Sequence, residues 1–205
     1  MLKKALLMAA LALAMPLAAF ASGQVDFTNA GGTLMGSSSG LSLSGSSLIF
    51  VDGFHGGGLI SGSNLGSVSF TTGALTSGSL AAGGMFAAGG TFMITGNGAN
   101  GLPAGTIFSG TFDQPVNWKL DAASTSTDHI YDFFAHVSGS FSNNKYVTSG
   151  AINFQIETGK NTFNGQAQLG SADTSILVPE PGTLSLFGTG ILALAGIIRK
   201  KMRAS

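Results

Sequence analysis

Hydrophobic and polar residues alternate in two stretches in the second half of the chain. The apolar members are Val116, Trp118 and Leu120 in one stretch, and Ile152, Phe154 and Ile156 in the other. A period of two puts apolar groups on one face and polar groups on the other, as a half-buried antiparallel strand requires. Shorter apolar runs recur at 41–43, 48–51, 65–70, 92–95 and 107–112, with glycine-rich turns between them. The pattern predicts a mainly β body, an antiparallel β-sandwich with a core of Trp118, Phe112, Ile152, Phe154 and Ile156.

The first half of this body is rich in glycine and serine, which is compatible with either a flexible linker or turns between strands. Residues 22–110 hold 23 of the 32 glycines. They also hold several phenylalanines, which a disordered segment would not need. We therefore interpret it as ordered β structure. Asn143-Asn144 lies between two further apolar runs and predicts a tight hairpin turn, because asparagine tolerates positive φ.

The N-terminal 21 residues have the pattern of a signal peptide. Lys3 and Lys4 precede an uncharged apolar run that ends at Phe20. Ala19 and Ala21 are small residues in the spacing of a cleavage site before Ser22. This pattern predicts export, and a mature chain that begins at Ser22.

The C-terminal segment, 178–205, is the most distinctive part of the chain. Pro179, Glu180 and Pro181 precede an uncharged apolar run at 183–198. The basic cluster Arg199, Lys200, Lys201 and Arg203 follows at once. Sixteen helical residues span roughly 24 Å, somewhat less than the ~30 Å hydrocarbon core, and basic side chains that reach the interface make up part of the difference. We predict a transmembrane helix at 183–198 with its basic tip in the cytoplasm; the alternative is a buried core helix.

In these features the C-terminal segment resembles that of the PEP-CTERM proteins of Gram-negative bacteria. The matching parts are Pro179-Glu180-Pro181, the short glycine-containing apolar run and the basic tip, in this order. The resemblance implies a sorting signal that an exosortase, a membrane-embedded cysteine transpeptidase, processes near the Pro-Glu-Pro motif. It further implies an anchor in the inner membrane with the body in the periplasm, followed by delivery to the cell surface or the extracellular matrix, commonly among exopolysaccharide. The same type of tail is also found on some ice-binding proteins.

Charge and composition narrow the functions of the body, residues 22–177. It has three lysines, no arginine and eight carboxylates, which gives a formal net charge of −5 and argues against nucleic acid as a partner. The chain has no cysteine, so disulfides, thiol chemistry and cysteine-bound zinc are excluded.

The best candidate for chemistry is the segment from Asp128 to His136. On a helix, His129, Asp132 and His136 would share one face and could bind a metal. On a strand, His129 and His136 would point to opposite faces, and the aromatic composition and the glycine that follows favour the strand. Asp121, Asp128 and Asp132 could supply a carboxylate pair for a hydrolase.

From these observations we predict a non-enzymatic surface or extracellular-matrix protein without catalytic residues, metal or cofactor. A carbohydrate- or ice-binding module is the alternative, and a hydrolase is a third hypothesis. Ice binding would require regular threonine arrays, and the body offers only 71–72 and 125–127. Carbohydrate binding requires an exposed aromatic residue, whereas the alternating pattern puts Trp118, the only tryptophan, in the core.

Overall fold

The computed structural model describes residues 23–54, 57–143 and 146–178. The predicted signal peptide at 1–21 and the predicted transmembrane helix at 183–198 lie outside these residues. Within the described ranges, no helix has the length and apolar character needed to cross a membrane.

A compact unit spans Gln24–Val178. Its elements are β1 (Gly23–Ala30), β2 (Thr33–Ser37), β3 (Gly40–Asp52), β4 (Ile60–Thr71), β5 (Leu75–Ser79), β6 (Gly83–Phe86), β7 (Gly89–Asn97), the 3-10 turn η2 (Ala99–Gly101), β8 (Ala104–Phe112), β9 (Val116–Leu120), β10 (Ile130–Phe141), β11 (Tyr146–Glu157), β12 (Gln166–Gln168) and β13 (Ser171–Val178).

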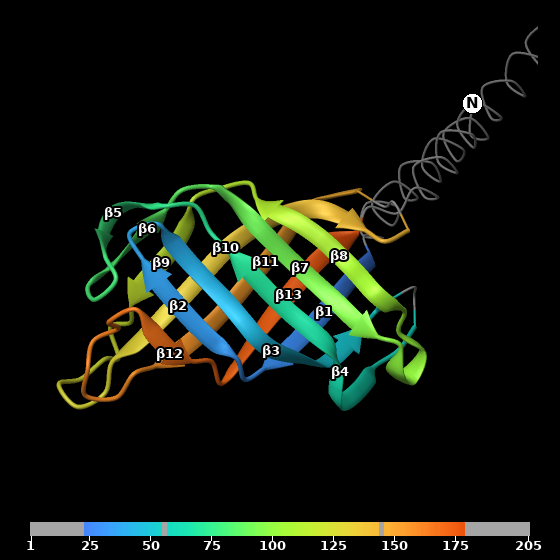
Figure 1. The fold of residues 1–205 in the computed structure, drawn as a ribbon, viewed down its shortest axis with the longest axis horizontal. Coiled ribbons are helices and arrows are strands. Elements are labelled where there is room, and N and C mark those ends of the chain that lie inside the picture. The colour runs from blue at the N-terminus through green and yellow to red at the C-terminus, as the bar shows by residue number, and fades with distance from the viewer. Residues whose placement is uncertain (1–22, 55–56, 144–145, 179–205) are drawn as a thin grey trace, which may run out of the picture. The chain divides into compact units, whose positions relative to one another are not determined.

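All these strands belong to one hydrogen-bonded sheet, which closes on itself (Figure 1). Eight strands follow one another in the order β11-β13-β1-β3-β4-β7-β8-β10, and β10 pairs back with β11. The predicted mainly antiparallel β fold is confirmed. The prediction of a sandwich is wrong in one respect, because a sandwich has two separate sheets with free edges. Here the long-range pairing of strands from both ends of the unit closes a single sheet.

Closure depends on two long strands that each pair with two partners on one side. The first part of β10, Tyr131–Phe134, pairs with β9, and the second part, Val137–Phe141, pairs with β8. On its other side β10 pairs with β11, with a register shift between Val137 and Gly139. A Cβ atom on Gly139 would meet the carbonyl oxygen of Ser109 on β8, so only glycine fits this close approach. In the same way β3 pairs with β2 through its first residues and with β1 through its last.

The core fills the interior of the closed sheet. Alternate residues of β10 are buried, from Tyr131 through Phe133 and Ala135 to Val137. The residues predicted to form the core, Trp118, Phe112, Ile152, Phe154 and Ile156, are all buried, which confirms that prediction. The period-two pattern of the sequence thus decides which side chains face inward.

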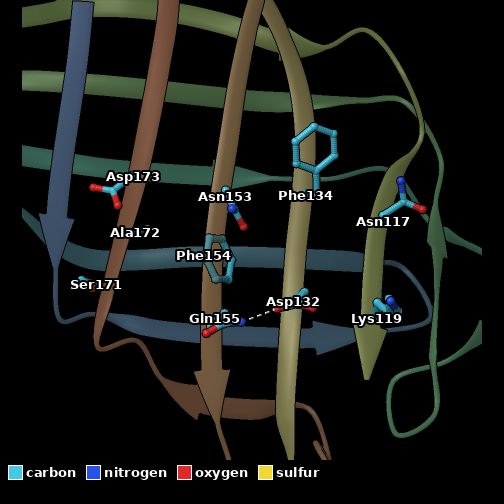
Figure 2. Close-up of a pocket in the computed structure, with 10 residues that line it drawn as sticks. All are labelled: Asn117, Lys119, Asp132, Phe134, Asn153, Phe154, Gln155, Ser171, Ala172 and Asp173. Atoms are coloured by element: carbon cyan, nitrogen blue, oxygen red, sulfur yellow. Dashed lines mark hydrogen bonds between the residues drawn. The ribbon is translucent and has the colours of Figure 1, made fainter. Parts of the chain in front are cut away.

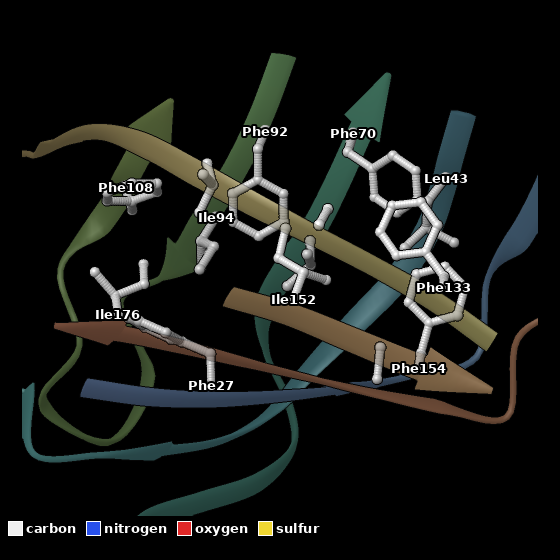
Figure 3. Packing of buried hydrophobic residues seen from close by; sticks show 14 of the residues in the cluster. Phe27, Leu43, Phe70, Phe92, Ile94, Phe108, Phe133, Ile152, Phe154 and Ile176 are labelled. Atoms are coloured by element: carbon white, nitrogen blue, oxygen red, sulfur yellow. The ribbon is translucent and has the colours of Figure 1, made fainter. Parts of the chain in front are cut away.

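Aromatic rings dominate the packing inside the sheet (Figure 3). Phe133 and Phe154 are stacked with centroids 4.4 Å apart, and Phe70 packs beside both. A second group lies where β9 meets β10, with Trp118 stacked on Tyr131 at 4.8 Å. The indole Nε1 of Trp118 donates a hydrogen bond to the carbonyl oxygen of Leu80. The inward side chains of β9, β10 and β11 therefore pack into the core, and the other face of these strands points outward.

Candidate functional site

Phe134 is an exposed aromatic side chain on the outer face of β9, β10, β11 and β13. Its neighbours along β10, Phe133 and Ala135, point inward and are fully buried. Phe134 has the opposite parity and therefore points outward, with 40% of its surface exposed. Its ring contacts the ring of His136, two residues along the same face, edge-on at 5.1 Å. The sheet thus presents a large apolar ring on its outer face.

Strand register places polar side chains in a row on both sides of this ring. Phe134 lies opposite Asn117 of β9 and opposite Asn153 of β11. Asn153 in turn lies opposite Asp173 of β13. Because neighbouring strands are about 4.8 Å apart, these four side chains form a row that crosses the strands. A second, parallel row runs from Lys119 through Asp132 to Gln155.

The two rows line an open groove of about 610 Å³ (Figure 2). We call this feature the Phe134 groove. It is lined by Asn117, Lys119, Asp132, Phe134, Asn153, Phe154, Gln155, Ser171, Ala172 and Asp173. The groove combines three amide side chains, one ammonium group and two carboxylates around an exposed phenyl ring. These groups suit non-covalent recognition of a polar ligand that has an apolar face.

The carboxylates beside the groove are joined by an amide. Gln155 Nε2 donates a hydrogen bond to Asp132 Oδ1 at 2.8 Å and a long one to Asp121 Oδ2 at 3.5 Å. The structure therefore brings together two of the three aspartates considered for a hydrolase. The backbone N–H of Ala123 also donates to Asp121 Oδ1 at 2.7 Å, which ties this carboxylate to its own turn. Asp128 is not part of this arrangement; it lies in a turn where its N–H donates to Thr125.

The segment from Asp128 to His136 does not form the helical metal site. Residues 130–136 belong to β10, as the strand interpretation predicted. His129 lies just before the strand, with Nδ1 3.0 Å from the carbonyl oxygen of Gly159, whereas His136 packs on Phe134. Among the residues that the structure describes, no group of three or more His, Asp or Glu side chains is placed to hold a metal ion.

The threonine segments considered for ice binding do not form one array. Thr72 is buried, and its hydroxyl oxygen accepts a hydrogen bond from the N–H of Leu41. Thr125 and Thr127 lie 3.2 Å apart, hydroxyl to hydroxyl, in the turn after β9. The hydroxyl of Thr71 on β4 forms a hydrogen bond with the hydroxyl of Thr91 on β7. These residues therefore serve different local structures.

The residues predicted for sorting and processing lie outside the described residues. They are Ala19, Ala21 and Ser22 at the signal cleavage site, Pro179, Glu180 and Pro181 in the sorting motif, and Arg199, Lys200, Lys201 and Arg203 in the basic cluster. The described chain ends with β13, one residue before the motif.

The groove itself was missed by the sequence analysis, which considered only Trp118 as a sugar platform. The alternation of side chains along a strand could have indicated it. Phe133 and Phe134 are adjacent, so only one of them can point into the core. The polar partners Asn117, Asn153 and Gln155 also occupy outward positions of their alternating stretches. What the sequence lacked was the pairing of β9 with β10, which puts Asn117 beside Phe134.

Comparison with known proteins identifies the C-terminal segment. A family model of the PEP-CTERM protein-sorting motif matches residues 177–201. No curated protein and no solved structure matches the chain. The chain therefore carries a PEP-CTERM sorting motif, which confirms the resemblance noted in its sequence and indicates an exported protein that an exosortase sorts.

Proposed function

We propose that this chain is a non-enzymatic protein of the cell surface or extracellular matrix. In this proposal the tail holds the protein in the inner membrane, with the body in the periplasm, until an exosortase-type transpeptidase processes it near Pro179-Glu180-Pro181. The observation that carries the proposal is the PEP-CTERM match at 177–201, which begins at the last two residues of β13 and continues beyond the body.

The position of β13 supports processing beyond Val178. This strand lies between β11 and β1 in the closed sheet, and its residues pair with β11 from Ala172 to Ile176. A cut within β13 would remove part of a central strand and open the sheet. Pro179 and Pro181 lack the N–H that a sheet ladder needs, so strand pairing cannot easily extend through them. A transpeptidase that requires an accessible backbone would therefore cut the chain on the C-terminal side of β13.

The outer face of the body supports binding over catalysis. Asp121 and Asp132, the best carboxylate pair for a hydrolase, share the amide of Gln155, and the groove beside them presents mainly amides and a phenyl ring. Carbohydrate binding is accordingly the favoured second function, with the Phe134 groove as its site. If the protein were instead a hydrolase, the double variant Asp121→Asn, Asp132→Asn would abolish glycan hydrolysis without unfolding the body.

The sorting proposal is tested by replacing Pro179, Glu180 and Pro181 together with alanine. The apolar run at 183–198 and the basic tip remain, so we expect membrane insertion to persist, processing to stop and the full-length chain to accumulate in the inner membrane. Pro115→Ala is the matched control, because Pro115 is an exposed proline of the body outside the motif.

Cell fractionation with immunoblotting gives the readout. Deletion of residues 182–205 should release an unprocessed body into the periplasm, because the anchor is lost. Normal maturation and export of the triple-alanine variant would refute the role of the motif.

A further inference from the structure

The exposure of Phe134 has no evident role in folding. The core of β10 is complete without this ring, since Tyr131, Phe133, Ala135 and Val137 fill the inward positions. An apolar ring left in water between polar strand partners forgoes the free energy that burial would provide. Such a ring is available for a ligand that offers an apolar surface of similar size.

The polar groups on both sides of the ring are also available. Within the described part of the chain, the amides of Asn117 and Asn153 and the ammonium group of Lys119 have no hydrogen-bond or ion-pair partner. Side-chain amides donate and accept hydrogen bonds at once, as sugar hydroxyls do. The ring and these amides lie in one row at strand spacing, so a ligand that stacks on Phe134 can reach an amide on either side.

We propose that the Phe134 groove binds an extended, neutral polysaccharide, one whose sugars carry hydroxyl or N-acetyl groups but no carboxylate. The C–H face of a sugar ring stacks on Phe134, and the amides of Asn117 and Asn153 pair with hydroxyls of the flanking sugars. This inference deepens the proposed surface function, because a body delivered outside the cell meets polysaccharide there.

The negative charge of the groove and of the body favours a neutral glycan over an anionic one. Two carboxylates line the groove, Asp132 and Asp173, against the single ammonium group of Lys119. The body as a whole has a formal net charge of −5. A chain of uronic acids would therefore meet repulsion both in the groove and from the surrounding field, whereas a neutral chain would not.

The test is isothermal titration calorimetry on the full-length protein in neutral detergent micelles. The probes are cellohexaose and N-acetylchitohexaose as neutral ligands, and hexaguluronate as an anionic ligand of the same length. We expect at least one neutral hexasaccharide to bind and hexaguluronate not to bind. Phe134→Ala should weaken binding about tenfold or more, because the stacking surface is lost. Phe134→Trp should retain binding.

Phe50→Ala is the matched control. Phe50 is a phenylalanine with the same 40% exposure on β3, and it does not line the groove. Its variant should bind like the unaltered protein, within about twofold. The proposal is overturned if the folded protein binds neither neutral hexasaccharide, if hexaguluronate binds as tightly, or if Phe134→Ala and Phe50→Ala have equal effects. These binding measurements do not depend on export. The binding proposal can therefore fail while the sorting proposal holds, and the sorting proposal can fail while the binding proposal holds.

Discussion

Removing the buried hydroxyl group of Tyr131 should destabilise the body far more than removing an exposed hydroxyl group. The hydroxyl of Tyr131 donates a hydrogen bond to the carbonyl oxygen of Ala81 at 2.6 Å and accepts one from the N–H of Phe163 at 3.0 Å. It thereby joins β10 to the β5–β6 turn and to the segment between β11 and β12. The variant Tyr131→Phe keeps the ring that stacks on Trp118 and removes both hydrogen bonds.

The expected loss of stability follows from how deeply the two hydrogen-bond partners of the Tyr131 hydroxyl are buried. Ala81 is half-buried, so water can partly replace the lost bond, and its loss costs about 1 kcal/mol. Phe163 is fully buried, so its N–H would be left without a partner, which costs about 1–3 kcal/mol. The expected decrease in the free energy of unfolding is about 2–4 kcal/mol. A domain of ordinary stability, about 5–15 kcal/mol, would remain folded.

Urea unfolding of the purified protein, followed by Trp118 fluorescence, measures this difference. The m-value should stay the same, because the surface exposed on unfolding is unchanged. Ser67→Ala is the control: it removes an exposed hydroxyl bonded to Thr95 and should cost less than about 0.5 kcal/mol. Equal effects of Tyr131→Phe and Ser67→Ala would refute the claim that the Tyr131 hydroxyl holds these segments together.

Two further substitutions test the packing of the closed sheet. Phe154→Asp puts an unpaired charge into the core and should abolish the cooperative thermal transition in circular dichroism, while Phe134→Asp, on the outer face, should leave the protein folded. Gly90→Ala should destabilise the protein by about 3 kcal/mol or more, because Gly90 has a φ of 76° and a Cβ atom there would clash with the carbonyl oxygen of Thr71. Gly31→Ala, with a φ of 68° and open space around it, should cost only about 1–2 kcal/mol in the same urea experiment.

In the clearly alternating stretches, the sequence was sufficient to predict which residues face the core. Trp118 and Phe154 lie at buried positions of alternating stretches, and side-chain alternation is a local property that any strand shares. The choice of strand over helix for 129–136 also followed from local composition. These predictions did not depend on which strands pair.

Closure and the groove depend on pairing between distant segments, which periodicity does not determine. Thr28 on β1 and Asp173 on β13 are 145 residues apart and hydrogen-bonded at 2.7 Å. Likewise, Asn117 lies beside Phe134 only because β9 pairs with the first part of β10 while β8 takes the second part. A pattern of period two fits a sandwich and a closed sheet equally well, so the sequence could not distinguish them.

Mass spectrometry of the exported protein tests the central claim, that the tail is a processed sorting signal separate from the body. Trypsin cuts after Lys160, and the next basic residue is Arg199, so the unprocessed chain yields a peptide that spans Asn161–Arg199. Processing by the exosortase predicts a shorter peptide that begins at Asn161, contains all of β13 and ends near Pro179-Glu180-Pro181. The intact Asn161–Arg199 peptide in the exported fraction, or a terminus inside Ser171–Val178, would contradict the account.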